Sequence, residues 1–323
     1  MKVGRGLSSV FFFLVALAAT SLAQQDAARF VQAGRPDEAL AALQLRVQTN
    51  PNDAQAFNLI CRAYFQMDRW EDAIHAAEQS VSLKPGSSEY HQWLGRAYGR
   101  KAEAGGPVGA LFLVRKLKGE FERAVALDAE NLSARADLAD FYTEAPSIMG
   151  GDKSKARQMA AYVAQRNPVQ GHAILAHIEE KGNKTAAEAE FKAATRESSK
   201  PAEPWVDLAS FYRRTGRLDD MQSAVDQAMS SPQHEGIALF NAARLLLAAG
   251  RNFSGAIQML RTYLALPVDR LSEEGPAFEA HYSLGLLLEK QGNMQAAVGE
   301  FRAALSLASE YKPAQDALAR VSR

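Results

Sequence analysis

The sequence predicts an all-α fold, a right-handed solenoid of about eight helix-turn-helix units followed by a C-terminal capping helix. The first observation is a repeat: Phe30, Tyr64 and Tyr98 lie 34 residues apart, as do Gly216 and Gly250. Self-similarity at this period is typical of stacked helical hairpins. The second is a fixed spacing of small side chains, and the third is the placement of glycine and proline between the predicted helices.

The small side chains recur where the two helices of each unit must cross closely. They are Ala27, Cys61, Gly95, Ala139, Ala176, Ala209, Ala243 and Gly285. Ala39, Ala73 and Ala297 each follow one of these positions by twelve residues, on the predicted second helix. Small residues facing one another let two helix axes approach, and bulky neighbours such as Leu43 and Phe301 fill the space toward the next unit.

The predicted units differ in length. They begin near residues 24, 54, 88, 132, 169, 202, 236 and 278, and a last helix over 313–321 is expected to cap the open end. Extra residues occur around 99–119, at 145–153 and at 267–276. In a solenoid, insertions map to loops on one face and often carry function; tolerated variation in loop length is an equally open alternative.

This pattern resembles the tetratricopeptide repeat family over nearly all of residues 24–323, most clearly at 56–85 and 278–309. The resemblance implies the solenoid fold and a role in binding other proteins, without catalysis and without a cofactor. It names no partner, because one fold serves many functions.

The N-terminus predicts a signal peptide over residues 1–23. Lys2 and Arg5 are followed by an apolar run over 10–19 and by small residues up to Ala23, where cleavage is expected. The chain is therefore expected to be exported to the periplasm or outside the cell. The alternative is a retained membrane anchor, although the run is shorter than the roughly 20 residues that span a bilayer.

The cysteine, the histidines and the balance of charges indicate which kinds of site the chain is not expected to have. Cys61 is the one cysteine, so a lipoprotein anchor behind the leader is not expected, and the thiol is expected to be buried and inert. The six histidines lack the spacing of metal ligands, so no metal site is predicted. With 37 basic and 37 acidic residues, no net field favours nucleic acid or a membrane surface. Residues 150–154 (GGDKS) faintly resemble a phosphate loop, but a turn before a helix is the simpler interpretation.

The concave face of the solenoid is the predicted binding groove, because the first helices of the units line it. Helical periodicity places these candidate partner-binding residues there: Asn58, Arg62, Phe65, Trp93, Arg96, Arg100, Arg213 and Arg244. Arginines and aromatic rings together predict a peptide with an acidic group or a free C-terminal carboxylate. The alternative is a solvated face on which these arginines are balanced by the acidic fourth unit.

Three functions remain open from the sequence. The first is an adaptor or scaffold that binds a partner protein in the cell envelope or outside the cell. The second is an enzyme or small-molecule binder, with a site near 147–153. The third is a structural array that self-associates through its end units. An apolar stretch at 110–114 (ALFLV) is either a partner or membrane contact or the core face of a long helix.

Overall fold

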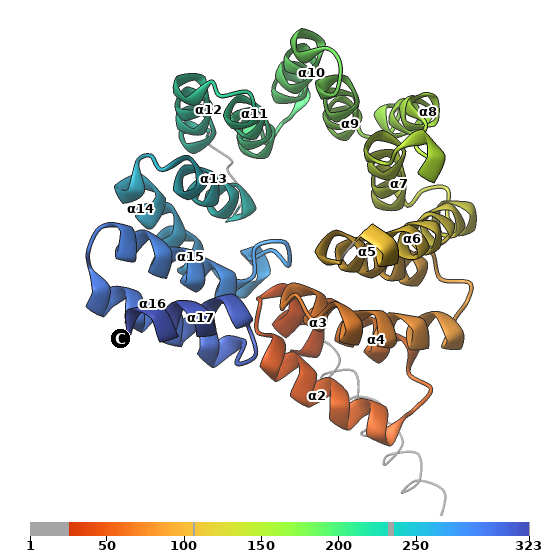
Figure 1. Cartoon of the computed structure of the whole chain (residues 1–323), viewed down its shortest axis with the longest axis horizontal. Helices are drawn as coiled ribbons and strands as arrows, with labels where there is room; N and C mark the ends of the chain where they lie inside the picture. Colours follow the sequence, from red (N-terminus) through yellow and green to blue (C-terminus); the bar gives the residue numbers. More distant parts are fainter. Residues whose placement is uncertain (1–25, 106, 232–235, 323) are drawn as a thin grey trace, which may run out of the picture.

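The structure is a computed structural model that describes residues 26–105, 107–231 and 236–322. The expected leader and its cleavage site lie outside these residues. The described chain is helical throughout, with antiparallel pairs following one another along the sequence (Figure 1), which confirms the predicted all-α solenoid. Within the described residues, no helix is both long and apolar enough to cross a bilayer.

Each unit contributes two helices. Residues 26–32 pair with α2 (Pro36–Thr49), and the remaining pairs are α3 (Ala54–Gln66) with α4 (Trp70–Leu83), α5 (Ser88–Ala104) with α6 (Pro107–Leu127), α7 (Leu132–Glu144) with α8 (Lys153–Ala164), α9 (Pro168–Glu180) with α10 (Lys184–Glu197), α11 (Ala202–Arg214) with α12 (Leu218–Ser230), α13 (Gly236–Ala249) with α14 (Phe253–Leu264), and α15 (Ala277–Lys290) with α16 (Met294–Leu307). The last helix is α17 (Lys312–Val321).

The small residues lie at the helix crossings, as predicted. A methyl group added to Gly95 would lie 2.5 Å from the ring of Phe121, and one added to Gly285 would lie 2.5 Å from the ring of Phe301. Cys61 occupies the equivalent place and is fully buried. The repeat in the sequence is therefore a repeat of close contacts between α-helices.

The insertions fall where the sequence places them and take ordered forms. α6 is long and ends at Leu127. The insertion at 145–153 contains the short 3-10 helix η1 (Ser147–Met149), which lies against α6. The long connection at 267–276 contains a second 3-10 helix, η2 (Val268–Arg270), and then runs back to α15.

The two ends of the described chain meet, so the solenoid closes into a ring (Figure 1). The N–H of Ala277 donates a hydrogen bond to the carbonyl oxygen of Ala33 over 3.4 Å. Ala27 and Val31, near the start, share one apolar cluster with Tyr311, near the end. The expectation of an open end beneath the last helix is therefore corrected: apolar residues of the first and last units cover each other.

Gly34 permits this closure. Its φ of +65° is the left-handed conformation that glycine adopts most easily. A methyl group here would lie 2.2 Å from the nitrogen of Ala277 and 2.4 Å from the Cα of Pro276. The loop at Gly34 thus contacts the backbone of the last unit, at a position where no residue larger than glycine fits.

Candidate partner-binding cavity

A cavity of about 870 Å³ opens on the concave side of the ring. Its walls come from α3, α5, α6, α7 and η1, and the connection between η2 and α15 closes one side. The apolar part of the lining includes Phe65, Trp93, Leu117, Phe121, Phe141 and Met149. Ligand pockets commonly have this size and a largely apolar lining with a few polar groups.

Phe65 and Trp93 lie on the first helices of adjacent units and share an edge-to-face contact at 5.4 Å between ring centroids. Both are only partly buried, and both line the cavity. The sequence predicted this aromatic pair in the groove, and the structure brings the two rings together. Partly exposed aromatic rings in a concave surface are typical anchors for partner side chains.

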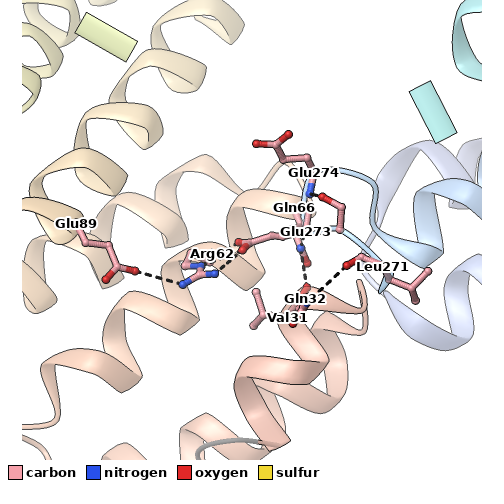
Figure 2. A network of polar contacts seen from close by, with 9 residues as sticks. Val31, Gln32, Arg62, Gln66, Glu89, Leu271, Glu273 and Glu274 are labelled. Carbon is pink, nitrogen blue, oxygen red and sulfur yellow. Dashed lines mark hydrogen bonds and ion pairs between the residues drawn. The ribbon is translucent and has the colours of Figure 1, made fainter. Parts of the chain in front are cut away.

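Arg62 lies beside this pair, but its charge is already engaged. Its Nε donates to Glu273 Oε1 at 3.0 Å and its Nη2 donates to Glu273 Oε2 at 2.5 Å (Figure 2). Glu89 provides a second carboxylate at 3.4 Å. The Gln66 side chain donates to the carbonyl oxygen of Glu273, and Gln32 donates to that of Leu271. The 267–276 connection is thus held against the first two units by polar contacts.

The next two arginines also have acidic partners. Arg96 donates to Asp137 at 2.7 Å and stacks over Trp93, with 4.9 Å between the guanidinium carbon and the ring centroid. Arg100 donates to Glu103 at 2.8 Å. Each of the three arginines of the predicted basic patch is therefore paired with a carboxylate of the same chain. Only Arg96 is balanced by the acidic fourth unit, because the partners of Arg62 and Arg100 lie in the 267–276 connection and on α5.

The cavity lining is acidic in sum. Six carboxylates line it, with two guanidinium groups, Arg96 and Arg100; the carboxylates are Glu103, Asp137, Asp140, Glu144, Glu273 and Glu274. Asp137, Glu103 and Glu273 pair with arginines, and Glu144 pairs with Lys181 at 2.7 Å. Among the described residues, the carboxylates of Asp140 and Glu274 show no ion pair and no hydrogen bond. These two carboxyl groups remain available to a ligand.

The surroundings of Asp140 disfavour its charged form. Removal of water by the surrounding protein, followed by repulsion from Asp137 and Glu144, raises the pKa of Asp140 to about 7, although Arg96 acts in the opposite direction. Across the ring, removal of water followed by repulsion from Glu203 and Glu274 raises the pKa of Asp207 to about 6. Both groups therefore hold a proton to a higher pH than a free aspartate does.

The other predicted groove residues lie elsewhere. Asn58 is buried at 1% exposure, and among the described residues its side-chain Nδ2 has no hydrogen-bond partner. Arg244 pairs with Glu279 at 2.8 Å, outside the cavity lining. Arg213 is exposed and is likewise outside the lining. Of the predicted set, the cavity gathers Phe65, Trp93, Arg96 and Arg100, with Arg62 at its edge.

The remaining candidate sites have structural explanations. Asp152 caps α8 by accepting hydrogen bonds from the N–H groups of Ser154 and Lys155, and Gly150 takes the left-handed conformation of a turn. This fits the interpretation of residues 150–154 as a turn. Cys61 is buried, which raises the pKa of its thiol to about 12. No group of three or more potential metal ligands gathers within the described ranges.

Glu273 and Glu274 are cavity residues that the sequence did not single out, whereas Met149 lies in the 147–153 segment offered as an alternative site. The three residues lie on the two inserted loops, 267–276 and 145–153. The signal available in the sequence was the extra length of both loops and the Ser-Glu-Glu-Gly run at 272–275. Their position in the cavity depends on ring closure, which a period of 34 residues does not reveal.

Comparison with family models identifies repeats at both ends of the chain. Residues 30–97 and 240–312 each match a model described as tetratricopeptide repeat. A stretch of 102 residues is 31% identical to the cytochrome c-type biogenesis protein CycH of Bradyrhizobium diazoefficiens. The match covers 32% of this chain and 26% of CycH, so the chain spans only about a quarter of that relative's length.

Two of the similar solved structures are described as tetratricopeptide repeat proteins. One from Parabacteroides merdae is 12% identical and has a TM-score of 0.48, covering 83% of this chain and 98% of that one. TTC0263 from Thermus thermophilus is 16% identical and also has a TM-score of 0.48, covering 56% of this chain and 92% of that one.

Proposed function

We propose that this tetratricopeptide repeat protein is an adaptor that binds a segment of another protein in the cavity on its concave face. The observation that carries the proposal is the cavity itself, which has the partly exposed aromatic rings of Phe65 and Trp93 in its wall. Side chains from five helical elements and one loop converge there, so the shape of the site is set by the ring and not by one flexible segment. A rigid apolar cavity with aromatic anchors suits recognition of a partner's side chains.

Export is part of the proposal. The basic start, the apolar run over 10–19 and the small residues ending at Ala23 support a cleaved leader, and hence a partner in the periplasm or outside the cell. Mass spectrometry of the protein recovered from the periplasm or medium tests this. A chain that begins at Gln24 supports export with cleavage, and a chain that keeps Met1 in the membrane fraction contradicts it.

The other two functions have less support from the structure. An enzyme near 147–153 needs converging reactive groups, yet Asp152 is engaged in capping α8 and Ile148 is 95% exposed. Self-association through the end units needs free ends, whereas the first and last units contact each other. Neither alternative explains the cavity with its partly exposed aromatic rings, whereas recognition of a partner there does.

Photo-crosslinking from inside the cavity tests the adaptor function. The residue chosen for replacement by a photo-reactive amino acid is Met149, which lines the cavity. Its neighbour Ile148 points into solvent and provides a matched control on the same loop. The proposal predicts a defined crosslinked partner from position 149 that is absent from position 148, both in cells that express the full-length chain.

A second variant connects the crosslink to the aromatic anchors. Trp93→Ala removes a ring from the cavity wall and is expected to reduce the crosslink from position 149, while circular dichroism shows that the helical content is retained. Equal crosslinks from positions 148 and 149, or none from either, would contradict the adaptor function.

A further inference from the structure

We propose that the cavity selects a partner segment in which a basic side chain, lysine or arginine, stands beside a large apolar one. This inference rests on the proposed function and specifies the chemistry of the partner. It differs from the acidic partner that the sequence predicted. It is carried by the arrangement of charges around the apolar floor of the cavity.

The first step is that carboxylates of the chain itself already bind the guanidinium groups of Arg62 and Arg96. Glu273 binds Arg62 through both of its oxygens, and Asp137 binds Arg96 at 2.7 and 3.2 Å. An incoming acidic group would have to displace one of these pairs or compete with Glu103 for Arg100. It would also bring a like charge toward the remaining carboxylates, which is unfavourable in a partly desolvated site.

The second step is that the two unpaired titratable groups of the cavity lining are both carboxyl groups, and a cation placed beside them favours their charged form. Asp140 projects from α7 and Glu274 from the loop that closes the ring, so they approach the cavity from different elements. Figure 2 shows the Glu274 side chain turned away from the Arg62–Glu273 pair. A lysine or arginine side chain placed between the apolar floor and these carboxylates gains charge-assisted hydrogen bonds.

The third step is that the floor suits the apolar part of such a segment. Phe65, Phe141 and Met149 present aromatic and thioether surface, and the stem of a lysine or arginine is itself apolar. Aromatic faces also attract a cation at close range. A volume of about 870 Å³ holds several side chains, so an extended peptide fits better than a single small cation.

Binding of three matched peptides to the full chain tests the inference. The probes are GSKLFKSG, its acidic counterpart GSELFESG and its neutral counterpart GSQLFQSG, carrying the same dye and read by fluorescence anisotropy. We expect the lysine peptide to bind about tenfold more tightly than the neutral one and the acidic peptide to bind most weakly. Raising the salt concentration should reduce the preference for lysine, because part of the attraction is between exposed charges.

Isosteric variants show which residues cause the preference for the lysine peptide. Asp140→Asn and Glu274→Gln each remove one cavity charge at constant size and should weaken the lysine peptide by about threefold to tenfold. Glu197→Gln removes one exposed charge outside the cavity lining and should leave the affinity unchanged. Equal effects of all three variants would overturn the inference, since the preference would then reflect net charge alone.

The remaining outcomes are also decisive. Tighter binding of the acidic or neutral peptide overturns the basic preference, while a crosslinked partner from position 149 would still support the adaptor function. Spermidine serves as a small cation without apolar side chains. If it displaces the lysine peptide at equal concentration, the occupant is a small cation and the peptide assignment is wrong. If no peptide binds and position 149 captures no partner, both proposals fail.

Discussion

Replacing Gly34 by alanine is the sharpest perturbation of ring closure, because Gly250 provides a matched control. Both glycines end the first helix of a unit in the left-handed conformation, with φ of +65° and +68°. An added methyl group at Gly250 meets nothing within 4 Å, whereas at Gly34 it would lie 2.2 Å from the backbone nitrogen of Ala277. Comparing the two alanine variants therefore separates the cost of the left-handed conformation from the cost of opening the ring.

The expected magnitudes follow from these contacts. A left-handed alanine costs about 1–2 kcal/mol at either position. At Gly34 the methyl group would lie more than about 1 Å inside normal contact distance with Pro276 and Ala277, and backbone atoms cannot rotate away. Overpacking of this kind adds about 1–3 kcal/mol. We therefore expect Gly34→Ala to destabilise the chain by about 2–5 kcal/mol, and Gly250→Ala by about 1–2 kcal/mol.

Urea denaturation and small-angle X-ray scattering measure the two consequences. Gly34→Ala should lower the urea midpoint more than Gly250→Ala does, and it alone should increase the radius of gyration, because the first and last units must separate. Equal losses of stability with an unchanged radius of gyration would show that the ends do not meet in solution. The packing argument for the ring would then be wrong.

Three further predictions follow from single contacts. A double-mutant cycle with Arg62→Gln and Glu273→Gln should give a coupling of about 1–2 kcal/mol in urea denaturation, since both side chains are partly buried and two hydrogen bonds join them; additive effects would contradict this. The pKa of Asp140 is about 7 in the fold and 3.8 in a free chain, so the native state binds the proton more tightly, and the stability that this group contributes is lost as the pH rises from about 4 to about 7. Asp140→Asn should therefore gain in thermal stability over the unsubstituted chain between pH 5 and pH 8, and a constant difference across that range would contradict the assignment. Cys61, whose pKa is about 12, should react with a thiol reagent at pH 8 only after unfolding in urea; fast labelling of the native chain would show that the thiol is accessible.

Much of the fold was predictable from the sequence because its cause is local. The close contact between Gly95 and Phe121 recurs at Gly285 and Phe301, and each pair belongs to a single helical hairpin. Such contacts leave a fixed spacing in the sequence, and the helices lie where that spacing predicts them.

Ring closure was not predictable in this way. Gly34 has the same role at the end of a helix as Gly250, and its contact with Pro276 joins positions more than 200 residues apart. The total curvature of a solenoid is the sum of small rotations between units, and a single sequence does not determine that sum. The end-to-end contact therefore appears only in the structure.

Some features of the cavity follow from local sequence patterns, and others depend on contacts between residues far apart in the chain. Helical periodicity placed Phe65, Trp93 and Arg96 on the concave face, and they line the cavity. The sign of the charge that the cavity offers depends on which carboxylate reaches which arginine. Glu273 reaches Arg62 across 211 positions in the chain, and no local pattern records that pairing. The sequence therefore placed Phe65 and Trp93 in the cavity wall, while the basic partner that we propose rests on contacts that only the structure shows.

The most direct test of the central claim, that the concave cavity is the recognition site, uses Trp93 as a reporter. The chain has three tryptophans, so Trp70→Phe together with Trp205→Phe leaves Trp93 as the only one. We predict that the lysine peptide shifts the emission of Trp93 to shorter wavelength, with a midpoint that matches its binding curve. An emission that stays unchanged while anisotropy reports a bound peptide would place the binding site elsewhere and contradict the claim.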